Sequence, residues 1–179
     1  MSTVQNPVDF MIRRTGISRN EMTAKHGLGK NLLLKACQGR VQSITPRISV
    51  VLWAEWRDRG IDQDEFDSRY HTLDLDLAYH RWRVQMRRDA AKSFGWDKLR
   101  LAQTTATSPF RRLVDALGGE TRAAKRLLVP DLPVSQYATG KQRVMPPSIY
   151  EALTQLRYPH LVELNKAQLQ WRRNQGLDD

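Results

Sequence analysis

The sequence predicts an all-α protein with two small helical domains, a long linker helix between them and a C-terminal amphipathic helix. Three observations lead to this fold class. Helix start and stop signals recur along the 179 residues, no Asn-Gly or Asp-Gly hairpin lies between alternating apolar residues, and the pattern of the first 60 residues returns near the end. We expect the two domains at residues 1–61 and 108–179, with the linker helix and a flexible linker at residues 62–107.

Helix-starting and helix-ending residues divide the first domain into four short helices. Pro7, Ser18 and Pro46 stand where helices are expected to begin. The expected helices cover about residues 8–14, 18–26 and 30–38, and a fourth runs from residue 46 until near Gly60. Each is followed by a glycine that permits the left-handed backbone of a helix end: Gly16, Gly27, Gly39 and Gly60.

The middle of the chain changes in charge. Residues 62–77 hold six acidic side chains and one basic, whereas residues 78–100 hold seven basic and two acidic. Residues 73–93 contain no glycine or proline, and their apolar side chains recur at helical spacing. We therefore expect one long helix of roughly 30 Å at 1.5 Å per residue. Its basic face is either a solvated helix surface or a brace along phosphates.

A polar linker and a last amphipathic helix are expected in the segments after this helix. Residues 103–107 are polar and threonine-rich, which is typical of a linker. The last helix, from residue 160 to about 173, places Leu161, Leu164 and Trp171 along one face. This stripe either covers the second domain's core or forms a dimer contact.

Two segments align without a gap at an offset of 101 residues. Residues 21–40 (EMTAKHGLGKNLLLKACQGR) align with residues 122–141 (RAAKRLLVPDLPVSQYATGK). The matched pairs are Leu28 and Val129, Leu33 and Val134, Ala36 and Tyr137, Pro46 and Pro147, Ile48 and Ile149, and Leu52 and Leu153. The preceding helices align one residue out of step, with Pro7 over Pro109. This pattern predicts two divergent copies of one small domain.

Residues 21–40 resemble the helix-turn-helix of the Cro and lambda-repressor type, and the resemblance extends over about 55 residues at each end of the chain. The pattern has a small residue where the helices cross (Thr23) and a residue tolerant of positive φ in the turn (Gly27). The second copy has Ala124 at the crossing but departs from the pattern in its turn, where Leu128 replaces glycine. Its recognition helix also departs, through Pro130, Asp131 and Pro133.

The resemblance implies that outward side chains of each second helix meet base edges in the major groove. In the first copy these are Lys30, Asn31, Leu34, Lys35 and Gln38; in the second they are Leu132, Ser135, Gln136 and Thr139. Asn and Gln pair with adenine, Lys with guanine acceptors, and leucine with the thymine methyl. The expected phosphate contacts are Arg19, Arg40, Ser43 and Arg47 in the first copy, Arg81, Arg87, Arg88 and Lys92 on the linker helix, and Arg122, Lys141, Gln142 and Arg143 in the second copy.

Composition restricts the other classes of function. The net charge of +10 needs either an acidic partner or a tolerance for self-repulsion. Nucleic acid, an anionic membrane surface and an acidic protein are the candidate partners, and double-stranded DNA is the expected one. The single cysteine, Cys37, and four scattered histidines predict no metal site, and no cofactor or small-molecule ligand is evident. No Ser-His-Asp set, paired-carboxylate motif or Gly-rich phosphate loop stands out, so we do not expect an enzyme. No signal peptide or membrane-spanning run is present, so we expect a bacterial cytoplasmic, nucleoid-associated protein.

The family members that this arrangement most resembles are temperate-phage immunity repressors, so the predicted function is sequence-specific transcriptional regulation, with repression favoured. Two unlike readers in one chain predict a monomer on one asymmetric site; a dimer through the C-terminal helix is the alternative. Two other hypotheses stay open. One is a protein-interaction adaptor or antitoxin-like module, and the other is an accessory DNA-bending factor in phage excision or replication.

Overall fold

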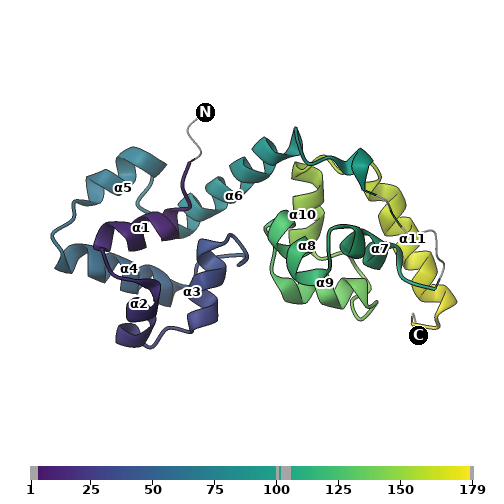
Figure 1. Ribbon diagram of the computed structural model, residues 1–179, viewed down its shortest axis with the longest axis horizontal. Helices are drawn as coiled ribbons and strands as arrows, with labels where there is room; N and C mark the ends of the chain where they lie inside the picture. Colours follow the sequence, from purple (N-terminus) through teal and green to yellow (C-terminus); the bar gives the residue numbers. More distant parts are fainter. Residues whose placement is uncertain (1–3, 100, 102–105, 178–179) are drawn as a thin grey trace. The chain divides into compact units, whose positions relative to one another are not determined.

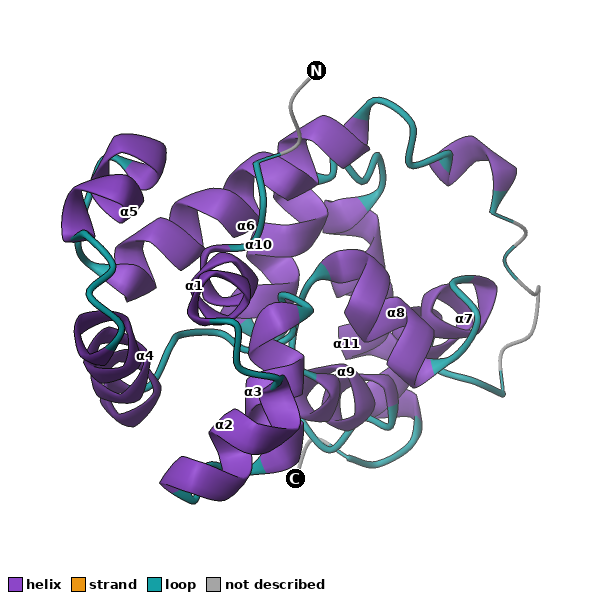
Figure 2. Ribbon diagram, turned by 60° about the vertical axis from the view of Figure 1, so that its left-hand side comes forward, coloured by secondary structure: helices purple, strands orange, loops and turns teal. Residues whose placement is uncertain are grey.

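The computed structural model describes residues 4–99, 101 and 106–177, and all regular structure in these ranges is helical (Figures 1 and 2). The predicted all-α class is therefore confirmed for them. The chain divides into two compact units, Met1–Gln85 and Met86–Asp179. No helix of the described ranges is long and apolar enough to cross a bilayer. Of the expected flexible linker, residues 103–105 lie outside the described residues.

The first unit follows the predicted helices closely. It contains α1 (Pro7–Thr15), α2 (Arg19–His26), α3 (Lys30–Cys37), α4 (Pro46–Asp58), α5 (Gln63–Tyr70) and most of α6 (Leu75–Ala91). The first four begin and end within two residues of their expected bounds. Asn6 caps α1 by accepting hydrogen bonds from the N–H groups of Val8 and Asp9, and Ser18 forms a capping box with Glu21 at the start of α2.

An aromatic cluster joins α5 to the helices before it. Phe10, Trp56, Phe66 and Tyr70 are all buried, and the rings of Phe66 and Tyr70 lie 4.6 Å apart. The Trp56 indole donates to the carbonyl of Met11 at 3.1 Å, so the buried N–H has a partner. Residues 63–70 thus form part of the first unit's core, whereas the sequence had suggested a linker from residue 62.

The first half of α6 also packs on the first unit. Leu75, Tyr79 and Trp82, which share the apolar stripe of the expected linker helix, are buried. The Trp82 indole donates to the carbonyl of Val4 at 2.9 Å. The stripe was therefore correctly placed on one helix, and its partner is the core of the first unit.

The second unit contains the end of α6 and the remaining helices. These are η1 (Trp96–Lys98), α7 (Pro109–Ala116), α8 (Glu120–Leu127), α9 (Asp131–Ala138), α10 (Pro147–Gln155) and α11 (Leu161–Asn174). α11 covers α7 and α10, with Leu164 buried and Leu161 packed against the core. Gln168 is wholly buried in α11, and its amide accepts from Phe110 N at 3.1 Å and donates to Tyr137 O at 2.9 Å. Of the two roles expected for the stripe on α11, the structure shows the core cover.

The helices of the two units repeat at the offset found in the sequence. α2 and α8, α3 and α9, and α4 and α10 begin 101 residues apart, and α1 and α7 begin 102 residues apart. The one-residue shift predicted for the first helices is thus present in the structure. The first helix of each unit is tied in the same way to the end of the third, since Asn6 donates to Cys37 O at 3.0 Å and Ser108 donates to Ala138 O at 2.6 Å.

The turn between the second and third helices has the same backbone in both units. Gly27 has a φ of 58° and Leu128 a φ of 52°, so the leucine adopts the left-handed conformation that glycine adopts without strain. The amide N–H groups of Leu28 and Val129 donate to the carbonyls five residues earlier, at 3.1 and 3.0 Å. A turn with a different residue therefore keeps the geometry that joins the two helices.

An arginine clamps this turn in each unit, but it comes from a different place. In the first unit Arg47, at the start of α4, donates to the carbonyls of His26 at 3.2 Å and Gly27 at 3.0 Å. In the second unit Ser148 occupies the position of Arg47. The two equivalent carbonyls there accept instead from Arg87 of α6, at 2.9 and 2.6 Å.

Candidate nucleic-acid interface

The outward face of α3 is polar and basic at its first turn. Lys30, Asn31 and Leu34 are exposed, whereas Leu33 and Ala36 are wholly buried. This division between inward and outward residues is the one expected from the sequence. It leaves an ammonium, an amide and an apolar side chain along one exposed edge of an eight-residue helix.

These side chains border a hollow of about 300 Å³ between the first turns of α2 and α3. Its lining residues are Ser18, Arg19, Asn20, Thr23, Lys30, Asn31 and Leu34. The Ser18 side chain accepts from Glu21 N, and the start of α2 carries the positive end of the helix dipole. Two cationic side chains, two amides and a helix N-terminus thus surround one concave surface, which suits a phosphate and an adjacent base edge.

The rest of the expected base-reading set is less exposed. Lys35 and Gln38 are half-buried near the end of α3. The Gln38 amide oxygen accepts a hydrogen bond from the Arg40 guanidinium at 3.1 Å, which fixes the two side chains relative to each other. Ser43 is exposed in the loop after α3, and Arg47 is exposed while it clamps the turn.

A buried carboxylate fixes the end of α2, and sequence reasoning missed it. The Glu55 side chain is 1% exposed in α4 and lies 2.5 Å from both Lys25 Nζ and His26 Nε2. The hydrogen bond from Lys25 holds the pKa of Glu55 below the ordinary carboxyl value, against the opposing effect of burial. Lys25 therefore serves the fold of the first unit. The sequence carried no spacing signal for this cluster because its members are about 30 residues apart.

One expected phosphate contact is wrong. Arg87 is 1% exposed and, besides its two turn carbonyls, donates to the Gln155 amide oxygen at 2.9 Å. Its guanidinium is thus buried in the second unit and cannot face phosphates. The other three basic residues expected on this helix (Arg81, Arg88 and Lys92) are exposed.

The second unit presents a different surface at the equivalent helix. Leu132 is 64% exposed at the position of Asn31, Ser135 and Gln136 are half-buried, and Thr139 is exposed. The Thr139 hydroxyl donates to the carbonyl of Ser135 at 2.9 Å. The expected phosphate contacts around this helix are exposed except for half-buried Gln142: Arg122, Lys141 and Arg143.

Charge is reversed at two equivalent positions of the two units. Glu120 stands where the first unit has Arg19, and Asp131 stands where it has Lys30. The Glu120 carboxylate accepts from Arg111 at 2.8 Å. The two cations that border the hollow of the first unit therefore have acidic counterparts in the second unit. This reversal of charge is visible only when the two copies are aligned position by position.

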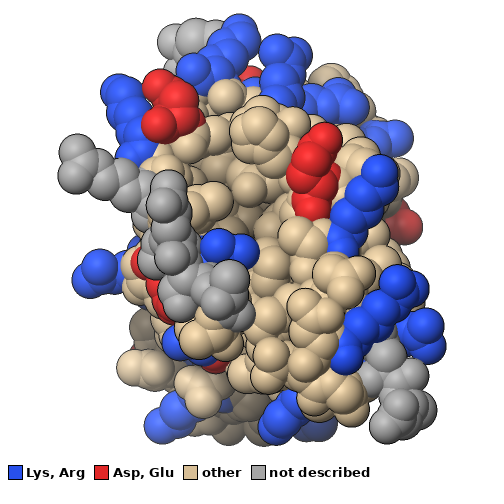
Figure 3. All heavy atoms as spheres, turned by 90° about the vertical axis from the view of Figure 1, so that its right-hand side faces the viewer, with Lys and Arg blue, Asp and Glu red and all other residues tan. Residues whose placement is uncertain are grey.

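Basic side chains nevertheless predominate over the whole chain, with 29 Lys and Arg against 19 Asp and Glu. On the face drawn in Figure 3, Lys and Arg outnumber Asp and Glu and lie mainly around a broad uncharged centre. Cys37 lies half-buried at the end of α3, and burial raises the pKa of its thiol to about 11. No group of three or more histidine, cysteine or acidic side chains lies close enough to hold a metal ion in the described part of the chain.

Comparison with protein-family models, with curated proteins and with solved structures finds no match for this chain.

Proposed function

We propose that this protein is a sequence-specific double-stranded DNA-binding regulator of transcription, most like a temperate-phage immunity repressor of the helix-turn-helix kind. The observation that carries the proposal is the hollow between α2 and α3, where Arg19, Lys30 and Asn31 meet at the first turn of an exposed helix. The net charge of +10 supplies the long-range attraction to DNA.

In this proposal α3 lies in the major groove. Asn31 pairs with an adenine, Lys30 donates to guanine acceptors, and Leu34 contacts a thymine methyl. Arg19 and the N–H groups at the start of α2 bind the adjacent phosphate and fix the register of α3. The buried pair of Glu55 with Lys25 supports this arrangement because it holds the other end of α2 on α4.

The second unit acts as an unlike reader in the same chain. Its helix pair repeats the backbone of the first, while its outward side chains, Leu132, Gln136 and Thr139 among them, differ from those of α3. Two unlike readers favour an asymmetric site bound by one chain. Sedimentation of the complex with a minimal duplex tests this point: one chain per duplex is expected, and two chains on a two-fold symmetric footprint would contradict it.

Selection from a random duplex pool, followed by affinity measurements on the selected site, tests DNA recognition. Asn31→Ala is expected to cost about 1–3 kcal/mol and to relax the base preference at one position. Asn174→Ala removes an exposed amide from α11 and serves as the matched control, with no expected change. A pool that yields no preferred sequence, or equal affinities for the two variants, would contradict the proposal.

A protein-interaction role for the second unit is the second candidate. Its α9 begins with Asp131, half-buried, and Leu132, 64% exposed, an acidic and apolar pair that suits a protein surface better than phosphates. Replacing Gln136 and Thr139 by Ala distinguishes the two roles. Unchanged DNA specificity favours protein binding, whereas a relaxed base preference favours DNA reading.

A further inference from the structure

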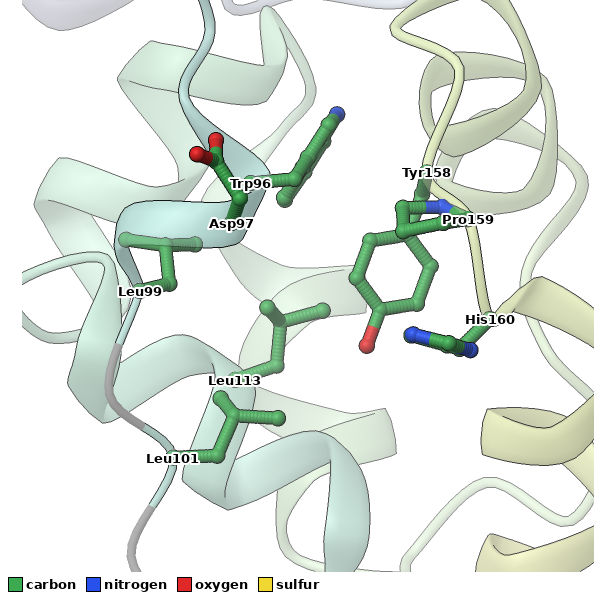
Figure 4. Close-up of a pocket in the computed structure, with 8 residues that line it drawn as sticks. All are labelled: Trp96, Asp97, Leu99, Leu101, Leu113, Tyr158, Pro159 and His160. Atoms are coloured by element: carbon green, nitrogen blue, oxygen red, sulfur yellow. The ribbon is translucent and has the colours of Figure 1, made fainter.

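A second hollow, of about 420 Å³, lies wholly within the second unit (Figure 4). It is formed by η1 with Leu99 and Leu101, by Leu113 of α7 and by the turn before α11. The lining residues are Trp96, Asp97, Leu99, Leu101, Leu113, Tyr158, Pro159 and His160. This volume falls within the range of small-molecule sites, roughly 300–1,000 Å³.

Aromatic and aliphatic side chains form part of the wall of this hollow, and hydrogen bonds and ring contacts hold them in place. The Trp96 indole donates to the carbonyl of Leu156 at 2.7 Å, and its ring stacks on Phe94 at 4.1 Å between centroids. Tyr158 meets the same indole edge-on at 4.8 Å. With Leu99, these rings form a preformed aromatic slot.

Two polar groups converge at one end of the slot. Figure 4 shows the Tyr158 hydroxyl directed toward the His160 imidazole, whereas the Asp97 carboxylate lies beyond Trp96 and is directed away. Burial raises the pKa of the Tyr158 phenol, with a further contribution from Glu163, so the group stays protonated and donates a hydrogen bond. Both polar groups therefore suit an acceptor.

Charge around the slot favours an anion as that acceptor. His160 precedes α11, whose first N–H groups carry the positive end of a 14-residue helix. A neighbouring hollow shares Trp96, Asp97 and Pro159 with the slot and is also lined by three cationic residues: Lys92, Lys98 and Arg157. These three cations outnumber the two carboxylates near the slot, Asp97 and Glu163.

We propose that this hollow binds a small aromatic carboxylate. The ring lies against Trp96, Tyr158 and Leu99, and the carboxylate accepts hydrogen bonds from the Tyr158 hydroxyl and the His160 imidazole. Such a ligand stabilises the second unit by mass action, because the binding surface exists only when α7, η1 and the turn before α11 are assembled. The site is separate from the α2–α3 hollow and requires no DNA.

Calorimetric titration of the full chain with 1-naphthoate, without DNA, tests the proposal. One molecule of 1-naphthoate per chain is expected, bound at least about tenfold more tightly than the neutral isostere 1-naphthamide. Tyr158→Phe and His160→Gln are each expected to weaken 1-naphthoate binding at least about fivefold. The matched controls are Tyr150→Phe, at an exposed tyrosine of α10, and His80→Gln, at an exposed histidine of α6, and both should bind as the parent does.

Leu99→Trp gives an independent check because it fills the slot and leaves both polar groups in place. Loss of 1-naphthoate binding with an unchanged circular dichroism spectrum is expected. Retained binding in Leu99→Trp would place the ligand elsewhere on this basic chain and overturn the proposal. Equal affinities for 1-naphthoate and 1-naphthamide, equal affinities of the Tyr158 and Tyr150 variants, or no heat of binding at all would also overturn it.

Discussion

Removing the two cations of the α2–α3 hollow is expected to change the salt dependence of DNA binding by a calculable amount. Each neutralised phosphate contributes about −0.9 to the slope of log K against log salt. A cation at a base edge in the groove displaces counterions much as one at a phosphate does. If Arg19 at the phosphate and Lys30 at the guanine each count as one neutralised charge, the double variant Arg19→Ala/Lys30→Ala makes the slope less steep by about 1.8. With no change at 1 M salt, affinity then falls about 60-fold at 0.1 M and about 20-fold at 0.2 M.

Fluorescence anisotropy with a labelled duplex between about 0.05 and 0.5 M salt measures this slope. Arg57→Ala/Lys166→Ala removes the same charge from exposed positions of α4 and α11 and serves as the control. Lys25→Ala is a second control, because this ammonium is bound to buried Glu55. The reasoning is refuted if the hollow variant and the first control change the slope equally, since the cations would then act only through net charge.

Buried polar groups lead to three further predictions. Arg87→Met should lower the free energy of urea unfolding by about 2–4 kcal/mol and Arg47→Met by no more than about 1 kcal/mol, because the Arg87 side chain is buried whereas that of Arg47 is exposed. Equal losses of stability in the two variants would contradict this. Lys25 lowers the pKa of Glu55. The stability that this ion pair contributes to the folded protein is therefore complete above about pH 4.5 and is lost as the pH falls further. Glu55→Gln should therefore flatten the acid side of a stability curve measured by urea unfolding, and an unchanged curve would argue against the pair. With a thiol pKa of about 11, Cys37 should react with iodoacetamide at pH 8 at least about 100-fold more slowly in the native protein than in urea, and similar rates would show an accessible thiolate.

The helices of the first unit were predictable because their signals are local. A proline, serine or threonine at a helix start and a glycine at its end act within four residues, so they are readable from sequence. The role of residues 63–85 was not predictable in this way, because the burial of Phe66 and Trp82 depends on long-range partners. The Trp82 indole, for example, finds its acceptor on Val4, 78 residues earlier, and no local pattern indicates such a pairing.

The candidate site was predictable to a similar extent. The periodicity of α3 assigned Leu33 and Ala36 to the core and Asn31 to the surface, because the helical period alone determines on which face of the helix each residue lies. It could not reveal that Arg87 is buried, since an arginine on a basic helix face is ordinarily exposed and its acceptors lie between 40 and 68 residues further on. Likewise, the hollow beside Trp96 joins residues about 60 positions apart, so only the folded chain brings them together.

The two units show which residues the shared backbone requires and which it leaves free. The turn keeps a left-handed residue although glycine is replaced by Leu128, and it keeps an arginine clamp although Ser148 replaces the arginine of α4. A clamp supplied from a different helix implies that the turn geometry itself is required. The residue type at outward positions is not constrained in this way, since Asp131 of α9 occupies the position of Lys30 in α3, a helix of the same length. Two copies that keep the geometry of a helix pair while reversing charge on its exposed edge are suited to different surfaces, which is why the first unit is expected to anchor the chain on DNA and the second to determine what else is recognised.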